Sequence, residues 1–226
     1  MDSILLIGQS NMVGFGDPAE VEPVSMKSIK VLRHGRWTPV TVAINPYCDR
    51  AGACIAETFA RSYADKYDTE VGLIPCAHGD TNIGMWGKGQ ALYDYAICNA
   101  KIAMRTSNLK AILWHQGESE CDDYEIYGEK LIKFINDVRA HLGLPNVPFI
   151  VGELGAYLVN HGAEKFKYYA EFNSAIKEVS EKMNNVGYAS AEGLTDLGDH
   201  LHFNAKSLHT FGYRYFDEYV RLTSKD

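Results

Sequence analysis

Short apolar runs alternate with longer stretches of helical period along most of this chain. An apolar run that stops at glycine or proline is typical of a buried strand. We predict strands at residues 4–7, 70–76, 110–115, 149–152 and 186–191. We predict helices at about residues 53–67, 91–105, 122–141, 164–183 and 205–222. Because strands joined through helices pair in parallel, the pattern predicts an α/β fold, a three-layer α/β/α sandwich around a parallel sheet.

Residues 15–50 break this alternation, because they lack a long helical period and contain four prolines. Within them, we expect residues 29–42 to form a short hairpin that turns at His34 and Gly35. The chain contains no internal repeat, no low-complexity tract and no segment with the composition of a linker. We therefore expect residues 1–226 to form a single domain, a length that allows a full hydrophobic core.

The overall composition argues against several classes of partner. Hydrophobic residues make up 46% of the chain and charged residues 23%, which is ordinary for a globular protein. The net charge of −7 argues against nucleic acid and against an anionic membrane surface, both of which need a basic face. No apolar run approaches the roughly 18 residues that a membrane span needs. We expect a small-molecule partner, and the sequence leaves the oligomeric state open.

Five cysteines, an odd number without a CxxC pair, favour reduced thiols over a disulfide framework. The chain also starts without a basic or long apolar leader. Both observations favour a cytoplasmic location. No activating base accompanies any of the cysteines in the sequence, so we expect them to fill space in the core: Cys48, Cys54, Cys76, Cys98 and Cys121.

Polar, glycine-rich segments follow three of the predicted strands. GQSNM (8–12) follows the first strand, AHGDT (77–81) the second, and WHQGESE (114–120) ends the third. A fourth polar segment, DHLHF (199–203), precedes the last helix. Because the carboxyl ends of parallel strands meet at one edge of a sheet, we expect these segments to form one site there.

Serine hydrolysis needs a hydroxyl nucleophile, a base within hydrogen-bond reach, a carboxylate that orients the base, and donors for the oxyanion. Ser10 supplies the hydroxyl, and Asp199 and His202 supply the carboxylate and the imidazole from one short segment. The Gln116 side chain and the backbone N–H groups of Ser10 and Gly52 are candidate oxyanion donors. We therefore expect Ser10 Oγ within hydrogen-bond reach of a His202 nitrogen, with Gln116 beside them.

The blocks GQSNM, WHQGESE and DHLHF, in this order, resemble the SGNH hydrolase superfamily, specifically its sialate O-acetylesterase and acetylxylan esterase branch. The similarity extends from residue 4 to about residue 216. The resemblance implies a flavodoxin-like α/β/α sandwich with about five parallel strands. It also implies an esterase that removes O-acetyl groups from carbohydrates through an acetyl-serine intermediate and needs no cofactor.

Residue by residue, the resemblance implies Ser10 as nucleophile, His202 as base and Asp199 as the group that orients it. It places the N–H of Gly52 and the side chain of Gln116 in the oxyanion hole with the N–H of Ser10. The chain departs from the family pattern at two places. Residues 53–55 (ACI) replace further glycines and a proline, and residues 78–81 (HGDT) replace a more usual Gly-Gly-Thr.

The candidate catalytic residues also have plainer structural interpretations. Ser10 and Asp199 are both residue types that cap the first turn of a helix. His200, His202 and His209 could form a zinc site, but their loose spacing without a nearby cysteine argues against it, and we expect no metal.

Five further residues are candidates for substrate contact or for support of the site. His115, inside the strand end, is not one of them, because we expect it to be a buried structural histidine. Glu118 either braces the Gln116 loop or touches substrate. Trp86 either belongs to the core or forms a platform on which a sugar stacks. The five candidates are Gln9, Asn11, Thr81, Trp86 and Glu118.

Three functions are compatible with the sequence. The leading one is hydrolysis of O-acetyl esters of a small or oligomeric carbohydrate. The first alternative is a general short-chain carboxylesterase without a preference for sugars. The second is a non-catalytic carbohydrate-binding protein on the same fold.

Overall fold

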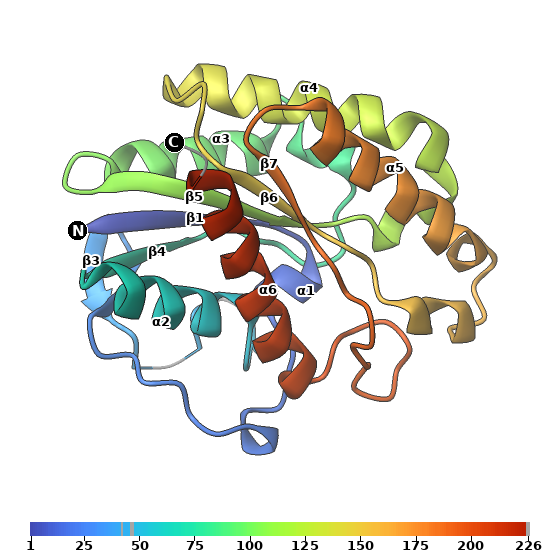
Figure 1. Ribbon diagram of the computed structural model, residues 1–226, viewed down its shortest axis with the longest axis horizontal. Helices are drawn as coiled ribbons and strands as arrows, with labels where there is room; N and C mark the ends of the chain where they lie inside the picture. The colour runs from blue at the N-terminus through green and yellow to red at the C-terminus, as the bar shows by residue number, and fades with distance from the viewer. Residues whose placement is uncertain (42, 46–47, 225–226) are drawn as a thin grey trace.

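Seven strands form one central sheet in the computed structural model, which describes residues 1–41, 43–45 and 48–224. Their order across the sheet is β3-β2-β4-β1-β5-β6-β7 (Figure 1). All neighbouring strands are parallel except β2 and β3. The strands are β1 (Asp2–Gly8), β2 (Ile29–Arg33), β3 (Arg36–Pro39), β4 (Val71–Pro75), β5 (Asn108–His115), β6 (Phe149–Gly152) and β7 (Val186–Ala189).

The five strands predicted from the apolar runs are present and follow the flavodoxin-like order, with β4 on one side of β1 and β5, β6 and β7 on the other. The predicted hairpin is also present, with its turn at His34 and Gly35. It adds two strands at the β4 edge, because β2 pairs in parallel with β4. The hairpin ends at Pro39, and Val42, its predicted end, lies outside the described residues.

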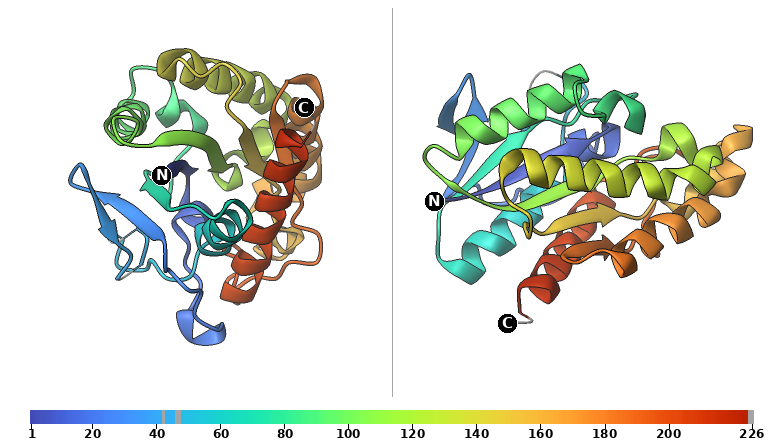
Figure 2. Two further views of the ribbon diagram at one scale, coloured as in Figure 1. Left: turned by 60° about the vertical axis from the view of Figure 1, so that its left-hand side comes forward. Right: turned by 90° about the horizontal axis from the view of Figure 1, so that it is seen from above.

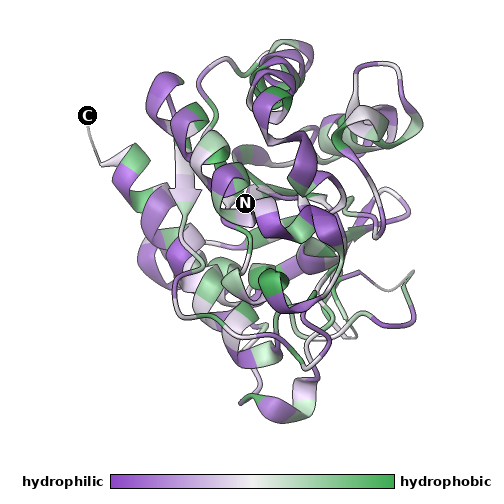
Figure 3. Cartoon of the chain, turned by 90° about the vertical axis from the view of Figure 1, so that its right-hand side faces the viewer, coloured by the Kyte–Doolittle hydropathy of each residue, from purple (hydrophilic) through white to green (hydrophobic). Residues whose placement is uncertain are grey.

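Five long helices cover the sheet. In Figures 1 and 2, α3, α4 and α5 lie on one face and α2 and α6 on the other, and helices that share a face contact one another. Along them, hydrophobic and hydrophilic residues alternate (Figure 3), as expected for helices with one buried side. The helices are α1 (Ser10–Val13), α2 (Ile55–Tyr67), α3 (Ala91–Ala103), α4 (Tyr124–Leu142), α5 (Tyr169–Lys182) and α6 (Ala205–Thr223).

Three helices begin later than predicted, each for a local reason. Helix α4 begins at Tyr124 and not at residue 122 because a 3-10 turn occupies Glu118–Asp123. Helix α2 begins at Ile55 because Ala53 forms an antiparallel bridge with Gly16. Helix α5 begins at Tyr169 because a tighter 3-10 turn occupies Glu164–Tyr168. Such changes at helix ends leave the order of the elements intact.

The core explains why the first strand is so apolar. The side chains of residues 4–7 are completely buried, because helices cover both faces of a parallel sheet. The strand ends at Gly8, whose φ is +130° and where a Cβ would come within 2.1 Å of the His115 carbonyl oxygen. Only glycine fits this approach, and the turn that it allows carries the chain into Ser10.

The cysteines are free thiols, and they differ in burial. Cys54, Cys76 and Cys121 are buried, and burial raises the pKa of each thiol above its ordinary value. Cys48 is half-buried and packs against the core, whereas Cys98 is exposed, so the expectation that all five fill the core was wrong for Cys98. In the described part of the chain, no helix combines the length and apolarity of a membrane span.

Candidate active site

Ser10 lies at the first position of the short helix α1, at the carboxyl end of the central strand β1. Its side chain is 6% exposed and lines a cavity of about 450 Å³. Segments far apart in the sequence form the wall of this cavity. Gln9 and Phe15 flank the serine, Gly79 comes from the segment after β4, and His202 comes from the loop before α6. The polar strand ends therefore meet at one edge of the sheet, as predicted.

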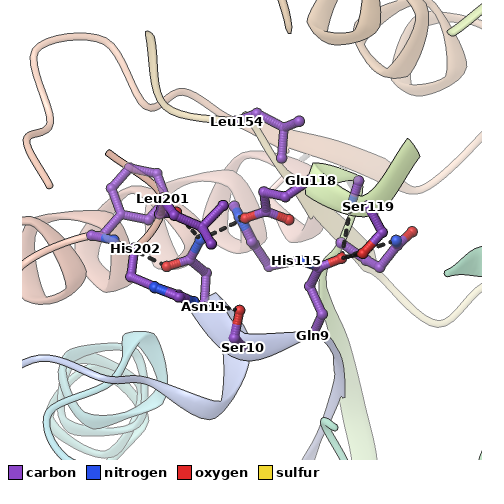
Figure 4. Close-up of polar contacts among 12 residues, drawn as sticks. Gln9, Ser10, Asn11, His115, Glu118, Ser119, Leu154, Leu201 and His202 are labelled. Carbon is purple, nitrogen blue, oxygen red and sulfur yellow. Dashed lines mark hydrogen bonds and ion pairs between the residues drawn. The ribbon is translucent and has the colours of Figure 1, made fainter. Parts of the chain in front are cut away.

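A continuous hydrogen-bonded chain joins the three residues predicted for serine chemistry (Figure 4 shows the first link). His202 Nε2 lies 2.9 Å from Ser10 Oγ. His202 Nδ1 lies 2.7 Å from Asp199 Oδ2. The structure thus brings the hydroxyl, the imidazole and the carboxylate together in the order that general-base activation of a serine needs.

The loop that carries Asp199 and His202 is organised by its own carboxylates. Asp199 Oδ1 accepts backbone N–H groups of Leu201 at 2.9 Å and of His202 at 2.8 Å. Asp196 accepts N–H groups of Gly198 and His200 in the same way. Partial burial acts to raise the pKa of the Asp199 carboxyl, but hydrogen bonds from His202 and Leu201 outweigh it and hold that pKa below its ordinary value. The carboxylate therefore remains ionised beside the imidazole.

Gly52 and Gln116, the other two predicted oxyanion donors, are not positioned for that role. The Gly52 N–H donates to the Gly14 carbonyl at 2.9 Å, and Gly52 is not among the residues that line the cavity. Gln116 Nε2 contacts Gln9 Oε1, the Thr81 carbonyl and Glu120 Oε2, all within 3.0 Å. An amide has two N–H hydrogens, and these three acceptors occupy both of them.

Gly79, and not Gly52, is the glycine that lies beside Ser10. A Cβ built on Gly79 would lie 3.8 Å from the Cβ of Ser10, and Gly79 lines the cavity. Within the described residues, neither the Gly79 N–H nor the Ser10 N–H has an acceptor. Sequence reasoning missed Gly79 as a donor, although Gly79 belongs to AHGDT (77–81), one of the segments already expected at the site.

Trp86 and Thr81 belong to the core and not to a sugar platform. Trp86 is fully buried, and its indole N–H donates to Thr81 Oγ1 at 3.1 Å. Its ring packs edge-to-face on Trp114, with centroids 5.5 Å apart. Thr81 is 1% exposed, and neither residue lines the cavity beside Ser10. Of the two interpretations of Trp86, the structure supports the core.

Gln9, Asn11 and Glu118 lie around Ser10. Gln9 lines the cavity, and its Oε1 is fixed by Gln116 Nε2 at 3.0 Å. Asn11 is buried and donates to Glu118 Oε1 at 2.5 Å, and His115 Nε2 lies 3.1 Å from the same oxygen. Burial acts to raise the pKa of the Glu118 carboxyl, but the charge and hydrogen bond of His115 and the bond from Asn11 hold it below its ordinary value.

The rim of the cavity carries basic and aromatic side chains that the sequence did not single out. The Arg50 guanidinium lies 4.5 Å from the centre of the Phe15 ring, and Lys165 Nζ lies 5.1 Å from that of Phe166. All four line the cavity, together with His161. These residues lie outside the polar motifs at the strand ends, so no motif pointed to them.

The three histidines considered for zinc each face a separate carboxylate. His200 pairs with Asp196, His202 with Asp199, and His209 with Glu57. In the described part of the chain, no group of three or more histidine, cysteine, aspartate or glutamate side chains is arranged to hold a metal ion.

Comparisons with known proteins identify the family of the chain. A family model described as "Carbohydrate esterase, sialic acid-specific acetylesterase" matches residues 1–221. A probable carbohydrate esterase of Arabidopsis thaliana is 27% identical over 232 residues, covering 90% of this chain and 84% of that protein. A crystal structure of an Arabidopsis thaliana protein superimposes with a TM-score of 0.84 at 25% identity, covering 97% of this chain and 98% of that one.

Two carbohydrate acetylesterases share the fold at lower identity. The enzyme of Xanthomonas citri has a TM-score of 0.74 at 16% identity, covering all of this chain and 57% of that one. The enzyme of Sinorhizobium meliloti has a TM-score of 0.59 at 14% identity, covering 98% of this chain and all of that one. Because the family model spans nearly the whole sequence, the chain belongs to the carbohydrate esterase family of sialic acid-specific acetylesterases.

Proposed function

We propose that this carbohydrate esterase is a serine enzyme that removes O-acetyl groups from sugars through an acetyl-serine intermediate. The observation that carries the proposal is the hydrogen-bonded chain from Ser10 through His202 to Asp199, with links of 2.9 and 2.7 Å. The serine lies in a cavity, where a substrate can reach it, and Ser10 and Asp199 contact the two different ring nitrogens of His202. This is the arrangement that activates a hydroxyl at neutral pH.

In the acylation step, Ser10 Oγ attacks the acetyl carbonyl carbon while His202 Nε2 takes the hydroxyl proton. The carbonyl oxygen becomes an oxyanion, which the N–H groups of Ser10 and Gly79 stabilise. The intermediate collapses when the bond from the carbonyl carbon to the sugar oxygen breaks. That oxygen leaves as a sugar hydroxyl after it takes the proton from His202.

Deacylation repeats these steps with water as the nucleophile. His202 takes a proton from water, whose oxygen attacks the acetyl carbon of the ester on Ser10. When the bond to Ser10 Oγ breaks, the proton on His202 returns to that oxygen and acetate leaves. Asp199 stays ionised and stabilises the imidazolium in both halves of the reaction.

The rim favours an acidic sugar over a neutral one. Arg50 and Lys165 place two cationic groups on the wall of the cavity. Asp80 and Glu118 also line it, and the Glu118 carboxylate is bound by Asn11 and His115. A carboxylate on the substrate would pair with them, whereas a xylan backbone has no charge to offer. Together with the description of the matched family, this favours O-acetylated sialic acids over acetylated xylan.

Turnover of four esters by the wild type and by Ser10→Ala tests this function. We expect the wild type to hydrolyse p-nitrophenyl acetate and O-acetylated sialic acid, and Ser10→Ala to lose a factor of about 10⁴ or more. Equal rates for the two proteins would eliminate the serine mechanism. Preference for a simple alkyl acetate over both acetylated sialic acid and acetylated xylo-oligosaccharide would indicate a general carboxylesterase. Sugar binding without hydrolysis of any ester would indicate a binding protein.

A further inference from the structure

One buried side chain, Asn11, holds the loop that carries the catalytic base. Asn11 Oδ1 accepts the N–H of Phe203 at 3.0 Å, and its Nδ2 donates to the Leu201 carbonyl at 3.2 Å. These two backbone groups belong to the residues on either side of His202. Asn11 therefore binds the loop backbone immediately before and after the base, and it does so from the position next to Ser10 (Figure 4).

Few other polar contacts connect this loop to the rest of the protein. In the part of the chain that the structure describes, residues 199–203 form hydrogen bonds to partners outside residues 195–204 only through Ser10 and Asn11. The bonds between Asp199 and His202 lie inside the loop and would move with it. The distance from His202 Nε2 to Ser10 Oγ therefore depends on Asn11 and on apolar packing.

Asn11 is itself held by Glu118, whose side chain also lines the cavity. Asn11 Nδ2 lies 2.5 Å from Glu118 Oε1, across 107 residues of sequence, and His115 donates to the same oxygen. The other oxygen, Oε2, is buried and has no partner among the described residues. A buried carboxylate with one unpaired oxygen lowers stability, so packing alone does not account for Glu118.

We propose that Asn11, supported by Glu118, is a positioning residue that fixes His202 against Ser10. The inference rests on the proposed serine mechanism. Asn11 does not line the cavity, so its effect should appear in the rate of the chemical step and not in substrate binding. A displacement of about 1 Å in a reacting pair can cost a factor of about 100 in rate.

The first test compares Asn11→Ala with a matched control, Asn173→Ala. Asn173 is also a buried amide that binds the backbone through both of its polar atoms. Its Oδ1 accepts the N–H of Leu154 and its Nδ2 donates to the carbonyl of Leu154, each at 2.9 Å. We expect Asn11→Ala to lower kcat for p-nitrophenyl acetate about 100-fold with KM little changed. Asn173→Ala should lower the midpoint of thermal unfolding while kcat of the folded protein stays within about threefold of the wild type. Equal losses of kcat would show that Asn11 is merely structural.

The second test uses Glu118, and it also decides the matter if Asn11→Ala fails to fold. Glu118→Gln keeps an acceptor for the Asn11 amide, whereas Glu118→Ala removes it. We expect Glu118→Gln to be at least about tenfold more active than Glu118→Ala, since the retained bond preserves the alignment. The double variant Asn11→Ala/Glu118→Ala should lose no more kcat than Asn11→Ala alone, because the two side chains act as one unit.

The outcomes separate this inference from the proposed function. If the wild type shows no ester hydrolysis that depends on Ser10, the proposed function fails. If hydrolysis depends on Ser10 but Asn11→Ala keeps its kcat or raises only KM, the positioning role fails alone. Equal activities of Glu118→Gln and Glu118→Ala, or multiplicative losses in the double variant, would likewise overturn it.

Discussion

Asp199 uses its two carboxylate oxygens for different purposes. Oδ2 binds the imidazole of His202, while Oδ1 accepts two backbone N–H groups and shapes the loop. These bonds lower the pKa of the carboxyl, so the negative charge persists under mildly acidic conditions. One short segment of sequence therefore supplies both the orienting charge and the frame that holds it.

At this scale we predict that Asp199→Asn lowers kcat about 10⁴-fold while the protein stays folded. The amide can still accept a hydrogen bond from the backbone, but it no longer stabilises an imidazolium. Asp196→Asn is the matched control, because Asp196 accepts N–H groups of the same loop without touching His202. The loss of kcat in Asp196→Asn should stay below about tenfold. Ester hydrolysis and circular dichroism on both variants check this, and similar losses would contradict a charge-based role for Asp199.

At the scale of elements, the sequence predicted which segments meet but not which atoms face the serine. The apolar runs located the five parallel strands, and their order follows from βαβ topology. Gly52 and Gly79 both lie in glycine-containing turns, and only the pairing of β4 with β1 places Gly79 beside Ser10. Long-range contacts of this kind have no local pattern in the sequence.

Substitution of the two glycines separates their roles. A Cβ at Gly52 would come within 2.2 Å of the Gly16 carbonyl oxygen, so Gly52→Ala should destabilise the fold by about 1–3 kcal/mol and leave kcat of the folded protein largely intact. A Cβ at Gly79 would meet Ser10 at an ordinary distance, 3.8 Å. Gly79→Val should therefore keep its stability but lose kcat/KM by narrowing the space for the acetyl group. Denaturant unfolding and kinetics check both, and the reverse pattern would favour Gly52 as the oxyanion donor.

At the scale of the whole molecule, cationic side chains reach the cavity although the chain is acidic overall. The net charge is −7, yet Arg50 and Lys165 line the cavity from segments far apart in the sequence, together with Asp80 and Glu118. Composition indicated only the overall acidity, because the local sign of charge depends on how distant loops come together. For the same reason, the strand-end motifs predicted that Ser10, His202 and Asp199 come together but not which side chains form the rim of the cavity.

We predict that Lys165→Gln raises KM for O-acetylated sialic acid about fivefold to tenfold and leaves KM for p-nitrophenyl acetate unchanged. An exposed ion pair with a substrate carboxylate contributes on the order of 1 kcal/mol. Lys167→Gln is the control, because Lys167 pairs with Glu164 and does not line the cavity. Equal effects on the charged and neutral esters would argue against an acidic substrate.

The most direct test of the serine mechanism is to locate the acetyl group during turnover. The wild-type protein is mixed with p-nitrophenyl acetate, quenched in acid within milliseconds to seconds, digested, and analysed by mass spectrometry. The mechanism predicts one acetyl group on Ser10, which disappears as substrate is exhausted and is absent in Ser10→Ala. Turnover without acetylation of Ser10, or an acetyl group on another residue that forms and decays at the turnover rate, would contradict it.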